Sequence, residues 1–515
     1  MTNPITFFIL IGLYPVIFLV SKNWFVYETK QLVFLLVIPV ITGMVGLIGV
    51  YASTFLKRLI SQGIRRFLIS LAGFCLLYLV FGATIAASRV AFFGFIAVAV
   101  ASCFLARKSG FYLINLLFVV MTLLASAELV YSVGTKSVKT DYLVPTLNEE
   151  ADDKIKFVTK PNIYLIHLES YHSPEAMKRI YNFDNQNFVD ELKNREFFVS
   201  QNNFSNYINT LNSVGAIFLQ QHHYYSRASG VEDSVGMRDM IGGKLYNPTL
   251  SILKNNGYMI SYIHPSTYSF IGNSYLDYYY PTSKIYDSLL IFQNVRITKL
   301  HDILFGATDP NKRKLEYSDE DDFYRVLHAE IETERENTKP TFYFIKEPLK
   351  VNHTPSRGKY TWEQSEDGWV DTYVQSVKDS NPKILDTVDR IIESDPTAVI
   401  ILYGDHGAWR YKNIWVDGSG RIDETIYERR QLSMDELALD LFGIITAVRY
   451  PNGDPSILDN ETFVNMFRIL FAELSGSEAP TAKQEDASFI KYLGNVYKIV
   501  ENGKALERAE IVEVP

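Results

Sequence analysis

The sequence of 515 residues predicts two unlike parts: a helical membrane domain of five spans, and a carboxyl-terminal α/β domain with a mostly parallel, doubly wound sheet. Five long apolar runs fill the first 131 residues, and each approaches the roughly 20 residues that cross a bilayer. Beyond residue 160, short apolar β-branched runs alternate with helical patterns, as in parallel sheets covered by helices. Charge divides the chain similarly. Residues 1–135 contain nine of the 50 Lys and Arg residues and two of the 58 Asp and Glu residues. The rest of the chain contains 41 basic and 56 acidic residues.

The apolar runs are interpreted as membrane-spanning helices. Lys and Arg concentrate in residues 57–66 and 107–108, and loops rich in these residues stay on the cytoplasmic side. The amino terminus is therefore expected inside, and everything after Tyr131 outside. The first run lacks a basic start and four more runs follow it, which argues against a cleaved signal peptide. The predicted spans are Pro4–Ser21, Gln31–Leu56, Phe67–Ser88, Val90–Ala106 and Phe111–Tyr131.

Three domains follow from this division: five spans in residues 1–131, a polar juxtamembrane linker in 132–160, and an extracytoplasmic α/β domain in 161–515. The predicted location is the cytoplasmic (inner) membrane, with the last domain periplasmic or extracellular. Both cysteines, Cys75 and Cys103, fall within predicted spans. The exported domain therefore has no disulfide and must be stable through its core.

The motif Asp405-His406-Gly407 follows the apolar run Ala398–Leu402, which is typical of a buried parallel strand. Open α/β sheets place their chemistry at the carboxyl ends of strands. A carboxylate and an imidazole together on a tight turn can bind one metal ion. The alternative is a surface turn in which both side chains only cap the following segment.

Glu169 has the same position after a second predicted strand, Ile163–Leu168. A carboxylate is costly to bury there unless it meets a cation. Ser170 or Ser173 would cap a helix that begins near Pro174. Thr210 lies in a hydroxyl-rich loop before an apolar helical pattern, where it is either a nucleophile activated by a metal ion or an ordinary helix cap.

Two histidines also follow predicted strands: His264 after Tyr258–Ile263, and His353 after Thr341–Lys346. A lone histidine there is often a hydrogen-bonded structural residue, but two at equivalent strand ends favour a role in the site. Residues 356–380 are read as loop packing, with an aromatic lid as the alternative, and the tail after Ser475 indicates little. The sequence contains no nucleotide-binding glycine loop and no basic nucleic-acid patch.

With these motifs in order, the chain resembles the lipoteichoic acid synthase and phosphoethanolamine transferase group of the alkaline phosphatase superfamily, whose catalytic domains are sulfatase-like. The resemblance covers the architecture of the whole chain. It implies that Glu169, Thr210, Asp405 and His406 hold one divalent metal ion, most often Mn²⁺ or Zn²⁺, with Mg²⁺ possible. It also implies that Thr210 takes up a phosphoryl headgroup, while His264 and His353 contact the phosphate or the leaving group. One alignment places Ser213 at the nucleophile position instead.

The resemblance implies a transferase that moves the headgroup of a phospholipid donor onto a glycan or glycolipid acceptor at the membrane. The segment 407–428 lacks the extra histidine common in phosphoethanolamine transferases, and the soluble domain lacks their disulfides. Both features favour phosphoglycerol over phosphoethanolamine as the transferred group. The sulfatase motif C-x-P-x-R is absent, so a classical sulfatase is not expected. Two alternatives stay open: hydrolysis with water as acceptor, and a non-catalytic membrane protein that binds a glycan or a partner.

Overall fold

In the computed structural model the chain forms two compact units: Met1–Val138 with Ser283–Glu316, and Lys139–Thr282 with Tyr317–Pro515. In the second unit the structure describes residues 154–225, 237–264, 276–280, 320–333, 338–348, 362–408, 433–476, 483–492 and 495–512, except positions 239 and 244. In the first it describes scattered helical residues between 9 and 130, which belong to three of the predicted spans. The spans predicted at 67–88 and 90–106 lie outside the described residues. None of the described helices has the length and apolar character that a membrane crossing requires.

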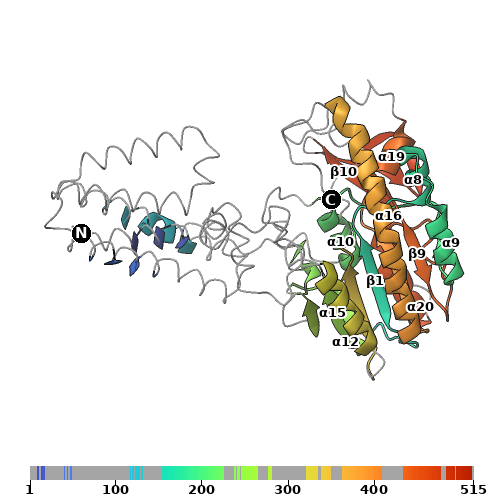
Figure 1. Ribbon diagram of the computed structural model, residues 1–515, viewed down its shortest axis with the longest axis horizontal. Helices are drawn as coiled ribbons and strands as arrows, with labels where there is room; N and C mark the ends of the chain where they lie inside the picture. Colours follow the sequence, from blue (N-terminus) through green and yellow to red (C-terminus); the bar gives the residue numbers. More distant parts are fainter. Residues whose placement is uncertain are drawn as a thin grey trace. The chain divides into compact units, whose positions relative to one another are not determined.

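A seven-stranded mixed sheet, of which Figure 1 labels β1 and β9, forms the centre of the second unit. Its strand order is β2-β9-β7-β1-β6-β4-β5. β1 pairs in parallel with β6 and β7, and β4 pairs in parallel with β6 and β5. β9 is antiparallel to both β7 and β2. The sheet is therefore parallel across its middle, as the alternating pattern predicts. Its strands are β1 Ile163–Leu168, β2 Phe198–Val199, β4 Met259–Ile263, β5 Tyr278–Tyr280, β6 Thr341–Lys346, β7 Val399–Gly404 and β9 Thr446–Arg449.

Alternate residues of the central strands enter two separate cores, one on each face of the sheet. In β1, Tyr164, Ile166 and Leu168 join one core, while Ile163 and Leu165 join the other. Because side chains in a strand point alternately to opposite faces, buried strands of this kind need helices on both sides. The first core is covered by α8 Pro174–Tyr181, α9 Gln186–Asn194, α15 Glu320–Thr333, α16 Trp362–Ser394 and α19 Met434–Phe442, and the second by α10 Thr210–Leu219, α12 Pro248–Asn255, the 3₁₀ turn η6 Phe463–Asn465 and α20 Met466–Ser475.

Helix α16 corrects one prediction, because residues 362–380 are helical and not loop. Pro382 lies inside this helix, where proline removes a hydrogen bond and usually ends a helical pattern. The helix nevertheless buries Tyr373, Val377, Ile384 and Val388 against the sheet. Tertiary packing along one face therefore outweighs the local cost of the proline.

The carboxyl-terminal tail forms a three-stranded antiparallel sheet that the sequence pattern did not reveal. Its strands are β10 Ala487–Tyr492, β11 Asn495–Glu501 and β12 Lys504–Val512. Phe489 N donates to Asn206 O at 2.8 Å, and Ser488 Oγ donates to Ser205 O at 2.6 Å. β3 Asn203–Phe204, which directly precedes Ser205, pairs with β8 Gly443–Ile444 in a two-stranded antiparallel sheet. The tail thus holds the segment that leads to Thr210.

The last described residues of the predicted linker pack against the core of the second unit. Ile155 and Phe157 are buried in the second core, and Phe157 N donates to Asn256 Oδ1 at 2.8 Å. Val158 N also donates to Leu474 O at 2.8 Å. The chain is therefore fixed to the domain a few residues before β1 begins.

Candidate metal centre

Strand alternation places five polar side chains at one edge of the sheet, on the face that α10 covers. Leu165, Tyr262, Phe344 and Tyr403 belong to the second core. Because the side-chain period of a strand is two, the residue two positions after each of them lies on the same face, and in all four cases that residue is polar. These polar residues are His167 and Glu169 of β1 and its end, His264 after β4, Lys346 of β6 and Asp405 after β7.

The turn after β1 is tied directly to the turn after β7. Ser170 has a φ of 52°, and its backbone N–H donates to Asp405 Oδ1 at 2.8 Å. Ser173 accepts a hydrogen bond from Ala176 N and caps α8, with Pro174 in the first turn. This confirms the capping prediction for Ser173. Asp405 is fully buried, and its second oxygen, Oδ2, faces the rings of His167 and His406.

The Asp405-His406-Gly407 turn aims the histidine at the same place. His406 Nδ1 lies 2.7 Å from Gly407 O, and the ring is 5% exposed. When Nδ1–H donates this hydrogen bond, Nε2 keeps its lone pair free to bind a metal ion. Metal-binding histidines commonly use this arrangement. His406 Nε2 lies 3.3 Å from Asp405 Oδ2 and 3.8 Å from Glu169 Oε1.

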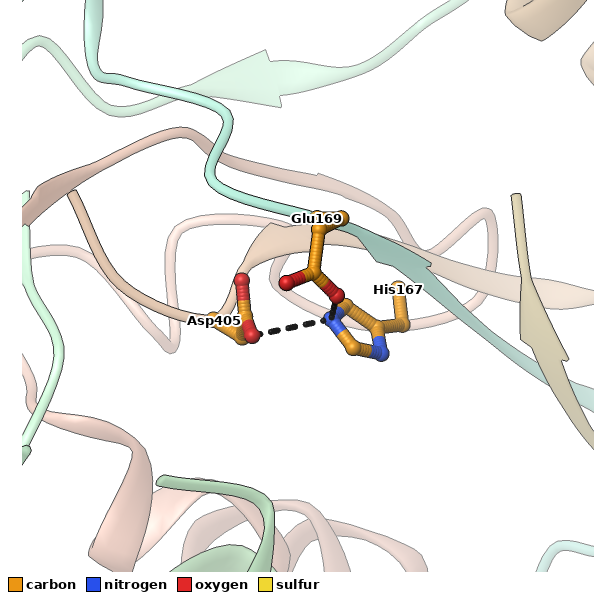
Figure 2. A group of neighbouring side chains, drawn as sticks. All are labelled: His167, Glu169 and Asp405. Atoms are coloured by element: carbon orange, nitrogen blue, oxygen red, sulfur yellow. Dashed lines mark ion pairs between the residues drawn. The ribbon is translucent and has the colours of Figure 1, made fainter. Parts of the chain in front are cut away.

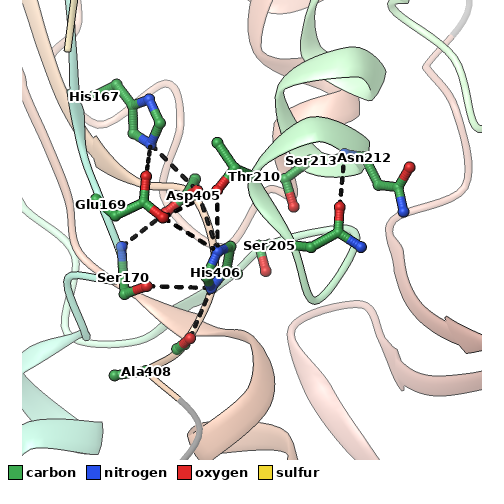
Figure 3. Close-up of polar contacts among 12 residues, drawn as sticks. His167, Glu169, Ser170, Ser205, Thr210, Asn212, Ser213, Asp405, His406 and Ala408 are labelled. Atoms are coloured by element: carbon green, nitrogen blue, oxygen red, sulfur yellow. Dashed lines mark hydrogen bonds and ion pairs between the residues drawn. The ribbon is translucent and has the colours of Figure 1, made fainter. Parts of the chain in front are cut away.

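Thr210 is the first residue of α10, and its hydroxyl faces this cluster (Figure 3). Thr210 Oγ1 donates to Glu169 Oε1 at 3.0 Å and lies 3.3 Å from His406 Nε2. The helix cap is Asn209, whose side chain accepts from Asn212 N, so the prediction of Thr210 as the cap is wrong. Ser213 is buried, and its hydroxyl donates to Tyr207 O at 2.8 Å.

His167 completes a second group of possible ligands that the sequence reading missed (Figure 2). His167 Nε2 lies 3.2 Å from Asp405 Oδ2 and 3.7 Å from Glu169 Oε2. Ligand atoms of His167, Glu169 and Asp405 all lie within 4.8 Å of one another, and the three residues are buried. The spacing of the two residues could have revealed this, because His167 is two residues before Glu169 and therefore on the same face of the strand.

The charges of the centre favour ionised carboxylates. Burial and Asp405 raise the pKa of Glu169, but Lys346, His167 and His406 outweigh them, and the net shift is downward. Burial likewise raises the pKa of Asp405, and His406, His167 and Lys346 more than reverse it. Burial, with Lys346 and His167 nearby, holds the pKa of His264 well below its usual value. The His264 ring is therefore neutral near pH 7.

The structure brings together four of the six residues predicted for the site: Glu169, Thr210, Asp405 and His406. His264 lies fully buried at the end of the neighbouring strand β4. His353 lies outside the described residues. His167 and Lys346 also belong to the cluster. The sequence analysis predicted both as strand residues and not as part of the site.

The donor set fits a divalent cation. Two buried carboxylates and two imidazole nitrogens converge within a few ångströms, and positive charge stabilises like charges that close in a protein interior, which a cation beside Lys346 would supply. Oxygen and nitrogen ligands together suit Mn²⁺, Zn²⁺ and Mg²⁺. Glu169, Thr210, Asp405 and His406 would hold the ion.

Replacing Gly407 is expected to damage both the fold and this turn. A Cβ at Gly407 would lie 1.9 Å from Asp440 O and 2.9 Å from His172 Cε1. We expect Gly407→Ala to lower the free energy of unfolding by about 1–3 kcal/mol, the usual cost of overpacking, and to weaken divalent-ion binding because His406 must shift. Denaturant unfolding and metal titration measure the two effects. A variant as stable as the wild type would show that the turn adapts.

Comparison with known proteins identifies the domain. A sequence model described as Sulfatase matches residues 161–431, more than half of the chain. Among curated proteins, none matches the sequence. The chain is similar to the solved structure of the lipoteichoic acid synthase LtaP from Listeria monocytogenes, with 14% identity over 73% of this chain and 92% of that one, and a TM-score of 0.43.

Two further solved structures are similar at comparable levels. One is the lipooligosaccharide phosphoethanolamine transferase EptA from Neisseria meningitidis, with 13% identity over 92% of this chain and 96% of that one, and a TM-score of 0.37. The other is an alkaline phosphatase superfamily protein from Vibrio parahaemolyticus, with 15% identity over 73% and 91%, and a TM-score of 0.40. The family match confirms the sulfatase-like fold that the sequence motifs predicted. On that match, the chain belongs to the sulfatase family.

Proposed function

We propose that this protein transfers the phosphoryl headgroup of a phospholipid, with phosphoglycerol favoured, onto an extracytoplasmic glycan or glycolipid. One observation carries the proposal: the Thr210 hydroxyl lies between Glu169 Oε1 and His406 Nε2. A hydroxyl at the start of a helix, beside side chains suited to a metal ion, supports a role for Thr210 as the nucleophile. Phosphoethanolamine transfer would use the same chemistry on another headgroup.

The residues divide the work as follows. A bound divalent ion supplies Lewis acidity, which lowers the pKa of a coordinated hydroxyl and neutralises charge on a phosphate. Thr210 Oγ1, whose proton is directed at Glu169 Oε1, attacks the phosphorus, so that an Oγ1–P bond forms and the bond to the diacylglycerol oxygen breaks. That oxygen takes up the proton that Thr210 releases, and diacylglycerol leaves as an alcohol. An acceptor hydroxyl then attacks the same phosphorus, so that a new O–P bond forms, the Oγ1–P bond breaks and the acceptor's proton returns to Thr210 Oγ1.

Two further features suit a phosphate. Thr210 is the first residue of α10, and the backbone N–H groups of a helix start favour an anion. His264 is neutral because of its burial, so it would donate a hydrogen bond to a phosphate or leaving-group oxygen and would not act as a strong acid. His353 is proposed for the same duty, on the resemblance alone.

The membrane has a physical use in this proposal. A lipid donor stays in the bilayer, and tethering the catalytic domain by the five predicted spans would keep the site near the headgroups and raise their effective concentration. We therefore place the protein in the cytoplasmic membrane with its catalytic domain outside.

The test is to trap the intermediate. We expect full-length protein incubated with Mn²⁺ and phosphatidylglycerol, without acceptor, to carry a glycerophosphoryl adduct on Thr210, which peptide mass spectrometry identifies. A parallel sample with phosphatidylethanolamine decides between the two headgroups. Diacylglycerol release with an adduct on Ser213, or with none, would overturn the threonine mechanism. Failure to bind a divalent ion or to release diacylglycerol would favour a non-catalytic binding protein.

A further inference from the structure

Lys346 places a positive charge inside the metal centre. It is the last residue of β6 and is in register with His167 of β1. Lys346 Nζ lies 2.6 Å from Glu169 Oε2, and both side chains are 12% exposed. An ion pair this enclosed is exchanged with water far less readily than a surface pair, so it constrains the carboxylate strongly.

The two oxygens of Glu169 therefore have separate partners. Oε1 accepts from Thr210 Oγ1 and faces His406 Nε2. Oε2 faces Lys346 Nζ at 2.6 Å and His167 Nε2 at 3.7 Å. A cation held together with Thr210 and His406 would use Oε1, while Lys346 keeps Oε2 engaged. Hydrogen-bonded partners of this kind orient ligating carboxylates in metal sites.

The arrangement also sets the charge of the centre. Glu169 and Asp405 contribute two negative charges, one divalent ion balances them, and Lys346 adds one positive charge if the imidazoles are neutral. A phosphodiester brings one negative charge, which makes the loaded site neutral overall. A second divalent ion at the triangle of His167, Glu169 and Asp405 would instead compete with the ammonium for Oε2.

We propose that Lys346 is a positioning residue that fills the place of a second cation, so that the centre holds a single divalent ion bound through one oxygen of Glu169. This inference rests on the proposed metal-dependent function. It predicts that the lysine opposes metal binding while it orients the ligand. Removing a positive charge next to a ligand should tighten binding of the ion, because the lost repulsion between ammonium and cation outweighs the looser orientation of the carboxylate, whereas damage to the fold would weaken it.

The experiment is a Mn²⁺ titration of full-length, metal-free protein in detergent, followed by calorimetry and by the EPR signal of free Mn²⁺. We expect the wild type to bind one Mn²⁺ per chain, and Lys346→Met to bind it about tenfold more tightly with slower diacylglycerol release. Lys346→Arg keeps the charge and should resemble the wild type. Lys254→Met is the matched control, because Lys254 pairs with Asp277 at 2.5 Å beside the start of β4, and it should leave the affinity unchanged.

The outcomes separate the two proposals. Two Mn²⁺ ions per wild-type chain, or unchanged or weaker affinity in folded Lys346→Met, would overturn the role of Lys346 and leave Thr210 as the nucleophile untouched. A wild type that binds no Mn²⁺, Zn²⁺ or Mg²⁺ would instead remove the metal-dependent function on which the inference rests.

Discussion

Thr210→Ala is expected to release diacylglycerol from phosphatidylglycerol at least roughly 10³-fold more slowly than the wild type, because the atom that attacks phosphorus is gone. The other proposed ligands, Glu169, Asp405 and His406, stay in place, so divalent-ion binding should weaken only modestly. Radiolabelled lipid measures the release, and Mn²⁺ titration of the same sample measures the binding. A large loss of activity with the metal still bound separates a nucleophile from a mere ligand.

Two variants make this prediction sharper. Thr210→Ser keeps a hydroxyl at the start of α10 and should recover most of the activity. Ser213→Ala removes the hydroxyl that bonds to Tyr207 O, which should cost about 1 kcal/mol of stability and leave the rate nearly unchanged. Wild-type release by Thr210→Ala, or loss of release in folded Ser213→Ala, would move the nucleophile to Ser213.

The second large effect is expected for Asp405→Asn. The amide oxygen can still accept from Ser170 N, which donates to Oδ1 at 2.8 Å in the wild type, so the turn after β7 should keep its shape. The negative charge, which two histidines and Lys346 stabilise, is lost. We expect divalent-ion affinity to fall by more than about 100-fold, since loss of an orienting partner alone often costs 10–100-fold, and activity to fall with it.

Asp440→Asn is the control for this change. Asp440 is also fully buried, and its Oδ1 accepts from Tyr181 Oη at 3.1 Å, a contact that asparagine can keep. Its affinity for Mn²⁺ should match that of the wild type. Equal ion affinity in Asp405→Asn and Asp440→Asn would show that Asp405 is not a ligand.

Much of the sheet and of the site could be predicted because both depend on local patterns. The strands Ile163–Leu168 and Thr341–Lys346 were predicted with the bounds that the structure has, since continuous burial on both faces produces unbroken apolar runs. Glu169 and Asp405 were conspicuous because a carboxylate directly after such a run needs a compensating charge. Parallel pairing of β1 with β7 then brings the two strand ends together.

Other features depend on contacts that a local pattern does not reveal. Lys346 lies at the end of an apolar strand, and only pairing between β1 and β6 makes it a neighbour of Glu169. Asn209 caps α10, which leaves the Thr210 hydroxyl for other partners. The sequence does not predict which residue is the cap, because the loop contains several residues that can cap a helix. The strands of the tail contain charged and exposed positions, so their alternation is weak.

That tail has a consequence for how the enzyme can change. Glu169 and Asp405 depend on the parallel strands, but Asn206, four residues before Thr210, donates to Ala487 O at 2.9 Å and accepts from Phe489 N. Two carboxylates of the proposed ion site and the proposed nucleophile thus rest on different parts of the fold. We expect substitutions in residues 487–489 to shift Thr210 while Glu169 and Asp405 stay in place, and so to change the rate of the proposed transfer more than the ion affinity.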